Sequence, residues 1–287
     1  MQKEHLGFLF GFLAAVASAL GALIVKETQE LPNTTMVFFR FAICLAFFVP
    51  HLVREGTSFS FHNLKSHLVR GLCGLGSVYC YFYSVEHLPL VNAITLSNTF
   101  VLFLPIIVFF GNRLIIPKAR LWAMAVGFLG VFLILRPTQG FSEWTNLVGL
   151  VGSVLAAIAI FGIRQLSKVE STETILSRYF LLSTIGSFVP MLMGWEPVAK
   201  PTLWWNLLGI GLLSLTYQYC LTKSLTFAPA TKVSTLNYLN VVFSGLLGWW
   251  FFGEVPTSWV IAGSVLVVVG GVIALLSKES SRPWGPR

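Results

Sequence analysis

The chain has 287 residues, of which 55% are apolar and only 10% are charged, against roughly 25% charged residues in an ordinary soluble domain. All eleven acidic residues are Glu, and the sequence contains no Asp. So little charge cannot cover the surface of a soluble protein of this size, and the composition therefore predicts an integral membrane protein. The absence of Asp also excludes Asp-based catalytic dyads and triads and Asp-dependent magnesium sites.

Ten apolar stretches are long enough to cross a bilayer, which takes about 20 residues. In chain order they run near 6–25, 34–53, 67–86, 91–110, 119–136, 146–164, 175–194, 203–222, 231–252 and 257–276. Only short loops and tails remain, and no Gly-x-x-x-x-Gly-Lys-[Ser/Thr] motif occurs, so we expect no ATP-binding domain. The prediction is an all-α, multi-pass protein of the cell (inner or plasma) membrane.

The cysteines lie inside the apolar stretches and lack CxxC spacing. They are Cys44, Cys73, Cys80 and Cys220. We interpret them as small packing residues rather than as a disulfide framework or a zinc site. No metal and no cofactor is expected.

The net charge of +8 is unevenly distributed along the chain. With the N-terminus placed in the cytoplasm, fourteen Lys and Arg residues fall on the cytoplasmic side, Arg70 and Lys168 among them. Three fall on the opposite side: Lys26, Arg136 and Lys200. This bias follows the positive-inside rule. It predicts that both termini are cytoplasmic, and that the basic charge reports topology rather than a nucleic-acid partner.

The chain repeats itself at a spacing near 140 residues. The matches include Arg40 with Arg178, Pro89 with Pro229, Thr95-Leu96 with Thr235-Leu236, and Gly130 with Gly270. The units, 6–136 and 146–276, are followed by a cytoplasmic tail, 277–287. Each unit contains five spans, an odd number, so the second must enter the membrane inverted. Inverted repeats favour a transporter that binds its substrate near the midplane, between the halves, and works by alternating access.

Several motifs carry a family resemblance. In the first half they are Arg40-Phe41, Arg70-Gly71, Tyr81-Phe82-Tyr83, Leu88-Pro89-Leu90 and Gly127-x-x-Gly130-Val131; in the second they are Pro229, Gly253-Glu254 and Gly263 with Gly270. Over 6–276 the chain resembles a pair of EamA units of the drug/metabolite transporter superfamily. The resemblance implies a ten-helix metabolite carrier whose cavity is lined mainly by its third, fourth, eighth and ninth helices. The chain departs from the family pattern at Gly111-Asn112-Arg113, where Gly-Glu is common.

Two symmetry-related spans carry polar stripes. Asn92, Thr95 and Thr99, with Asn98 alongside, follow helical spacing in the fourth span, and Asn237, Asn240 and Ser244 do so in the ninth. Polar groups are costly in lipid, so the stripes either line a hydrated cavity or join helices to one another. We expect the substrate to contact Thr95, Asn98, Asn237 and Tyr238, between aromatic walls formed by Tyr81 and Tyr217.

Arg40 and Arg178 lie about six residues inside their spans. Their long stems can extend to the membrane interface, or their charges can face a cavity. The spans contain almost no acid, since Glu86 and Glu254 stand at span ends. An unpaired cation beside a cavity suits an anionic or zwitterionic ligand, and we expect Arg40 to attract a carboxylate or phosphate.

Three classes of function compete. A proton-coupled drug antiporter needs a membrane-buried carboxylate, which the first span lacks because Glu4 precedes it and Glu27 follows it. A membrane enzyme is disfavoured because every His lies at a span end or in a loop and no carboxylates are paired. We therefore expect a secondary transporter, not an enzyme, acting as a monomer or homodimer. Efflux of an amino acid or related compound is the first expectation; uptake or exchange of a nucleotide-like metabolite such as S-adenosylmethionine is the alternative.

Overall fold

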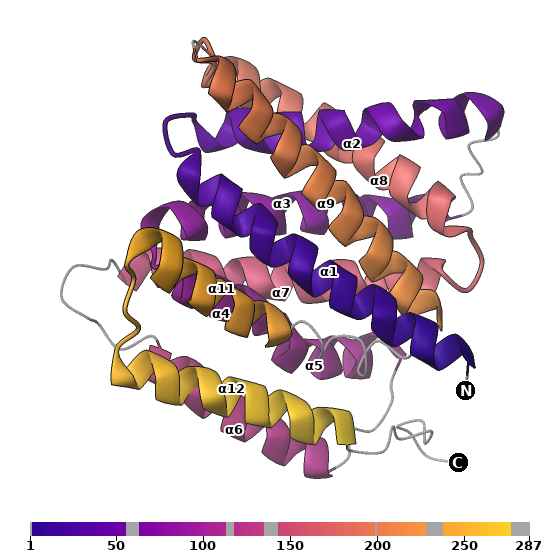
Figure 1. The fold of residues 1–287 in the computed structure, drawn as a ribbon. Coiled ribbons are helices and arrows are strands. Elements are labelled where there is room, and N and C mark those ends of the chain that lie inside the picture. The colour runs from indigo at the N-terminus through magenta and orange to yellow at the C-terminus, as the bar shows by residue number, and fades with distance from the viewer. Residues whose placement is uncertain are drawn as a thin grey trace.

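The computed structural model describes residues 2–55, 63–112, 118–134, 143–198, 200–227 and 238–276. All regular secondary structure in these ranges is helical (Figure 1). The helices are α1 (Gln2–Glu27), α2 (Asn33–Glu55), α3 (Leu64–His87), α4 (Leu90–Asn98), α5 (Phe100–Asn112), α6 (Lys118–Ile134), α7 (Glu143–Leu166), α8 (Thr172–Met193), α9 (Pro201–Phe227), α11 (Tyr238–Phe252) and α12 (Ser258–Leu276). The prediction of an all-α membrane fold is confirmed.

One predicted span is broken in the middle. Helices α4 and α5 together form a single apolar span over Leu90–Gly111, interrupted at Thr99, where the sequence had predicted one continuous helix. The backbone N–H of Thr99 bonds to the carbonyl of Leu96 at 3.1 Å, and that of Leu102 to the carbonyl of Thr99 at 2.8 Å. These short-range bonds keep the backbone groups satisfied through the break, as the membrane interior requires.

Five spans in the described residues are by themselves long and apolar enough to cross a membrane: His5–Glu27, Asn33–Arg54, Leu90–Gly111, Trp144–Leu166 and Thr172–Met193. Helices α6, α11 and α12 contribute shorter apolar stretches. Helices α3 and α9 are long but more polar, because they carry residues such as Arg70 and Gln218 that are buried inside the bundle.

The helices pair across the two halves in a symmetric pattern. Helix α1 packs on α9, and its counterpart α7 packs on α3, the counterpart of α9. Three further pairs, α2 with α8, α4 with α11 and α6 with α12, each join a helix to its counterpart in the other half. The contacts of α2 with α9 and of α3 with α8 are likewise related by exchange of the halves. In Figure 1 the α6–α12 pair lies below the rest of the bundle. Exchanging the halves leaves the pattern unchanged, as expected of two five-span repeats of opposite orientation.

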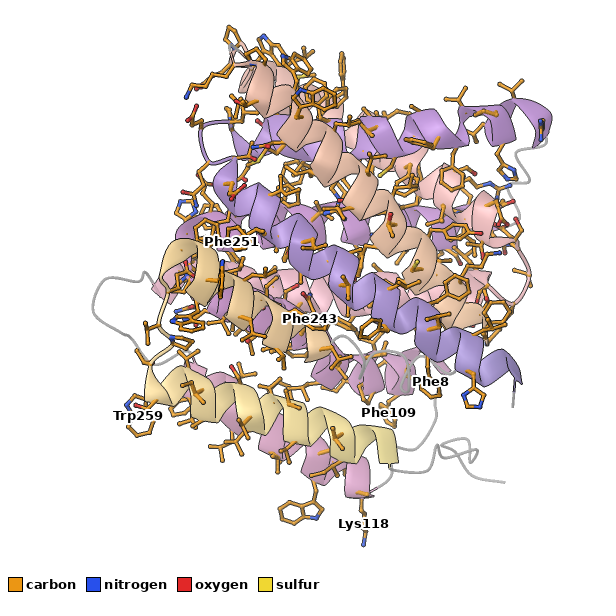
Figure 2. All side chains as sticks on the ribbon, in the orientation of Figure 1. Phe8, Phe109, Lys118, Phe243, Phe251 and Trp259 are labelled. Carbon is orange, nitrogen blue, oxygen red and sulfur yellow. The ribbon has the colours of Figure 1, made fainter. Side chains whose placement is uncertain are left out.

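The start of α1 and the end of α12 lie at the same end of the bundle, on the right in Figure 1. The outer surface is strongly apolar, with Trp122 at 72%, Trp205 at 72% and Trp250 at 77% exposure. Figure 2 shows Trp259 and Lys118 projecting outward from opposite ends of the α6–α12 pair. A surface of this kind faces lipid rather than water.

Two residues mark helix boundaries. Pro89 precedes the first residue of α4 as its N-cap, where the missing N–H costs nothing. Gly253 follows α11 with φ of 63°, a left-handed conformation that glycine adopts without strain. The repeat-related Pro229 lies outside the described residues.

Candidate functional site

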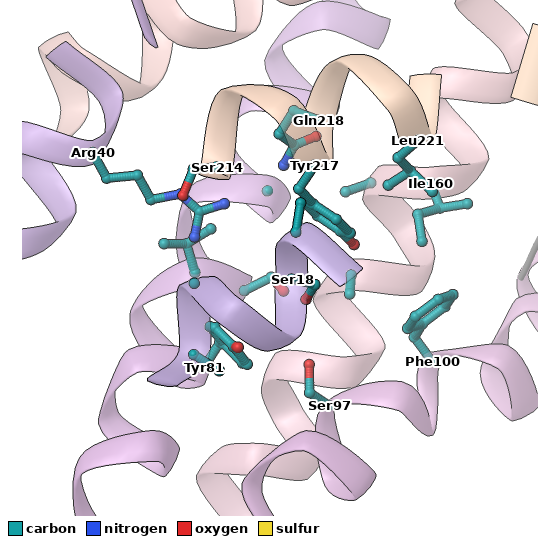
Figure 3. A pocket seen from close by; sticks show the side chains of 18 of the residues that line it. Ser18, Arg40, Tyr81, Ser97, Phe100, Ile160, Ser214, Tyr217, Gln218 and Leu221 are labelled. Carbon is teal, nitrogen blue, oxygen red and sulfur yellow. The ribbon is translucent and has the colours of Figure 1, made fainter. Parts of the chain in front are cut away.

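A cavity of about 110 Å³ lies between the two halves, where α1, α3 and α4 of the first half meet α7 and α9 of the second. Its polar lining residues are Ser18, Arg40, Arg70, Ser77, Tyr81, Ser97, Asn98, Tyr179, Ser214, Tyr217, Gln218 and Asn240. Figure 3 shows side chains from several helices converging on this space. None of the described lining residues is acidic, so Arg40 and Arg70 give this part of the cavity a positive charge.

Four of the seven predicted site residues line this cavity: Arg40, Tyr81, Asn98 and Tyr217. Asn237 lies outside the described residues, and Tyr238 begins α11 with a side chain that is likewise not described. The third, fourth, eighth and ninth spans contribute to the lining as the family resemblance implied. Helices α1, α2, α7 and α8 contribute as well.

Thr95 is fully buried but does not line the cavity. Its hydroxyl donates to the carbonyl of Val91 at 2.6 Å and lies 3.5 Å from Oγ of Ser264 on α12. The structure therefore places Thr95 in a contact between helices. The polar stripe on the fourth span is divided, with Asn98 on the cavity side.

Arg40 reaches the cavity from α2, and Figure 3 shows its guanidinium beside Ser214. The residue is 6% exposed. Within the described part of the chain, its charged group contacts only the rings of Phe41 and Phe82, each 5.5 Å from Cζ to the ring centroid. A buried cation without a carboxylate is costly, which favours a role in holding an anion.

Arg70 corrects the charge assignment made from the sequence. It was counted among cytoplasmic loop residues, but it lies about two turns inside α3 and is 3% exposed. Its Nη2 donates to Oε1 of Gln218 at 3.1 Å, and its Cζ lies 3.6 Å from the centroid of the Tyr179 ring. Because Arg70 lies near the start of a predicted span, the sequence did not indicate that it is buried in the cavity lining, although Arg70-Gly71 belongs to the family motif.

Arg178 differs from its repeat counterpart Arg40. Its Nη1 lies 3.2 Å from Oε1 of Glu170 and 3.0 Å from Nε2 of His67. His67 in turn lies 2.8 Å from Oε2 of Glu170 and is buried in α3. The expectation that Arg178 has no acidic partner is wrong, because Glu170 closely precedes α8. His67 lies in the first turn of α3, at the end of the predicted span.

Four cavity residues carry buried polar atoms without a hydrogen-bond partner in the described structure. These atoms are Nε of Arg70, the hydroxyl of Tyr81, the hydroxyl of Tyr179 and Oδ1 of Asn240. The amide nitrogen of Asn240 donates one hydrogen bond to Oγ of Ser18 at 3.0 Å, while its oxygen has no partner among the described residues. Unsatisfied buried groups are rare in folded proteins, and their presence around one cavity indicates a place for a polar ligand.

The sequence matches the model of the EamA-like transporter family twice, over residues 5–136 and 143–276. The chain belongs to the EamA-like transporter family. It is 34% identical over 281 residues to the pseudopaline exporter CntI of Pseudomonas aeruginosa, covering 95% of this chain and 97% of that protein. A riboflavin transporter of Rhizobium johnstonii is 28% identical, covering 99% of this chain and 95% of its own.

An S-adenosylmethionine uptake transporter of Rickettsia bellii is 24% identical and covers 98% of this chain and 97% of its own length. A solved crystal structure that is 20% identical matches 93% of this chain and 96% of its own with a TM-score of 0.70, which supports the fold. This EamA-family chain is therefore a multi-pass membrane transporter of a small metabolite, and not an enzyme.

At the end of the bundle where α1 ends, an ion pair joins the two halves of this EamA-family chain. Lys26 pairs with Glu254, and its Nζ also donates to the carbonyl of Leu88 at 2.9 Å. The other oxygen of Glu254 accepts from the backbone N–H of Leu90 at 2.7 Å, at the first turn of α4. Glu254 thus ties α1 and α4 to the turn before α12.

One of the two repeat-related positions at the opposite end carries a different residue. Under the internal repeat, Lys26 corresponds to Lys168, and Glu254 corresponds to Asn112, which cannot form an ion pair. Lys168 instead donates to Oε1 of Gln165 at 2.9 Å. The departure from Gly-Glu noticed in the sequence therefore makes the two ends chemically different.

Proposed function

We propose that this transporter exports a small zwitterionic or anionic metabolite of amino-acid type through the central cavity. The observation that carries the proposal is Arg40, whose buried guanidinium lines the cavity without an acidic partner in the described chain. A substrate carboxylate would supply the missing counter-charge through charge-assisted hydrogen bonds. The proposed contacts include Asn98, Asn237 and Tyr238, with Tyr81 and Tyr217 as aromatic walls.

The size of the cavity supports a substrate of this class. One water needs about 10–15 Å³ of such volume, so 110 Å³ accommodates roughly seven to eleven water-sized groups. An amino acid has a comparable number of non-hydrogen atoms. A flavin-sized ligand would require a wider cavity than this conformation offers.

The mechanism that we propose is alternating access by two inverted halves, 6–136 and 146–276. The symmetric pairing of helices supports it, because either half can rock against the other around a fixed central site. Opening at the Lys26–Glu254 end requires that ion pair to separate. The export direction is supported by the 34% identical relative, which is named an exporter.

Uptake or exchange of a nucleotide-like metabolite is the second candidate. The tyrosine rings that line the cavity support it, because aromatic rings stack on planar bases. The relative named an S-adenosylmethionine uptake transporter also supports this candidate. The absence of acid from the cavity lining argues against it for a cationic compound of that kind.

Counterflow in proteoliposomes tests the proposal. Purified protein is reconstituted with an internal pool of unlabelled amino acids, nucleosides or riboflavin, and entry of the labelled compound is followed. We expect amino acids to exchange, and Arg40→Gln to weaken their half-saturation about 10- to 150-fold. Arg164→Gln is the matched control, because Arg164 donates to the carbonyl of Leu225 outside the cavity lining. Exchange of nucleosides or riboflavin alone, or full activity in Arg40→Gln, would contradict the proposal.

A further inference from the structure

Arg40 and Arg70 line the cavity, and Arg178 does not. Arg178 contacts the carboxylate of Glu170, whereas among the described residues the guanidinium of Arg40 has ring contacts and no carboxylate. Arg70 has one neutral oxygen, from Gln218, and the face of Tyr179. The described lining of the cavity thus contains two guanidinium groups and no carboxylate.

The surroundings of Arg70 hold its guanidinium in one orientation. The ring of Tyr179, which is itself 1% exposed, covers one face of the group, and Gln218 fixes one edge. The Nε of Arg70 and the hydroxyl of Tyr179 are both buried without a partner in the described structure. These two donors belong to residues that line the same cavity, so an anion beside them would satisfy groups that are otherwise unpaired.

Gly74 makes this arrangement possible. It lies one turn after Arg70 on α3 and lines the cavity. A Cβ at this position would run into Nη1 of Arg70 and would lie 2.8 Å from Cε2 of Tyr179. The absence of a side chain at residue 74 therefore lets the guanidinium lie flat against the ring.

We propose that Arg70, with Tyr179 and Gln218, forms a second anion subsite, so that the cavity takes a ligand with two acidic groups, one at Arg40 and one at Arg70. The ligand class is an amino acid or related amine that carries two carboxylates. Its amine would donate to acceptors of the cavity that lack a donor, such as Oδ1 of Asn240. This inference rests on the proposed function and specifies its substrate class.

Charge balance supports two acidic groups rather than one. A ligand with a single carboxylate would neutralise one guanidinium and leave the other buried and uncompensated, which is costly in a low-dielectric interior. A dicarboxylate neutralises both. A guanidinium is also the side chain best suited to bind a carboxylate through two parallel hydrogen bonds.

Binding of matched ligand pairs tests the subsite. Thermal stabilisation of the purified transporter is measured against L-glutamate and L-glutamine, and against L-aspartate and L-asparagine, which differ only in the second acidic group. We expect the acid of a pair to stabilise the wild type at about 10- to 150-fold lower concentration than its amide. Arg70→Gln should remove this preference, because it weakens binding of the acid much more than binding of the amide. Arg164→Gln should keep the preference.

Gly74→Ala provides a second variant that retains both charges. Its Cβ displaces the guanidinium of Arg70, so the preference for the acid should also fall, and this outcome does not depend on whether Arg70→Gln folds. Equal binding of acid and amide by the wild type, or a preference that survives in both variants, would overturn the subsite. Failure of every amino acid to bind or exchange would instead overturn the proposed function, so the two failures are distinguishable.

Discussion

Arg40 and Arg178 occupy repeat-related positions but have different environments, and this difference is testable through stability. Neutralising Glu170 removes the carboxylate that Arg178 contacts, whereas Arg40 contacts no acid among the described residues. Breaking a buried ion pair by deleting one partner costs about 3–5 kcal/mol. We therefore expect Glu170→Gln to lower the melting temperature of the detergent-solubilised protein markedly, and Arg40→Gln to leave it unchanged or raise it.

The exposed pair of Lys200 and Glu30 supplies the control for this comparison. Its side chains are 60% and 57% exposed, and such pairs contribute about 0–1 kcal/mol. Glu30→Gln should therefore leave the melting temperature nearly unchanged. If Glu170→Gln and Glu30→Gln behave alike, the buried cluster has no structural role.

Comparing two tyrosines that lie two residues apart on α3 distinguishes a role in substrate binding from a role in packing. The hydroxyls of Tyr79 and Tyr81 are both buried and unpartnered in the described structure, but only Tyr81 lines the cavity. We expect Tyr81→Phe to weaken half-saturation of transport about two- to twelvefold, the value of one neutral hydrogen bond. Tyr79→Phe should have no effect. A loss of transport in both variants would show that the hydroxyls act through folding.

The sequence predicted some of the individual residues that line the cavity. Tyr81 and Tyr217 belong to the tyrosine-rich third and eighth spans, and both line the cavity. The position of Arg70 near a predicted span boundary is typical of a loop cation, so the sequence did not indicate its burial. The contacts of Gln218 and Tyr179 with Arg70 are tertiary, and no local sequence pattern predicts them.

At the scale of helices, glycines allow α6 and α12 to lie in close contact. A Cβ on Gly130 would lie 2.5 Å from the carbonyl oxygen of Gly263, and one on Gly270 would lie 2.7 Å from that of Ala123. Small residues are the usual means by which membrane helices approach one another closely. The internal repeat had matched Gly130 with Gly270, and the structure shows that both serve the same helix pair.

Gly130→Ala tests this contact. The added Cβ meets rigid backbone rather than a movable side chain, so we expect a loss of about 1–3 kcal/mol of stability, measured as a lower melting temperature. Gly245→Ala in α11 is the control, because its Cβ would lie 3.6 Å from Cγ2 of Val91, an ordinary contact. A stable Gly130→Ala variant would mean that α6 and α12 can separate without cost.

The interruption between α4 and α5 could not be predicted from the hydropathy pattern of the sequence. Hydropathy and length predict a single span, and they are correct about the extent of the apolar stretch. The break at Thr99 depends on a tertiary contact, because its hydroxyl lies 2.8 Å from Oγ of Ser153 on α7. Periodicity within one helix contains no information about such a partner.

At the scale of the whole molecule, the distribution of Lys and Arg predicts which end of the bundle faces the cytoplasm. Removing the buried Arg70 from the count leaves a bias of thirteen to three, which still favours cytoplasmic termini. In a cysteine-free background, Ser142→Cys should react with a membrane-impermeant thiol reagent added outside intact cells. Ser167→Cys, in the opposite loop region, should react only after the cells are permeabilised. The reverse pattern would invert the topology.

The central claim is that substrate crosses through the cavity between the halves by alternating access. The direct test places Ser214→Cys in the cavity lining and adds Lys26→Cys with Glu254→Cys, which a short bifunctional thiol reagent can join. With that end locked, we predict that transport stops. The cysteine at position 214 should then be protected from an impermeant thiol reagent added on the Lys26 side. It should still react with the same reagent added on the opposite side. Continued transport with the end locked, or simultaneous labelling from both sides without the lock, would contradict the mechanism.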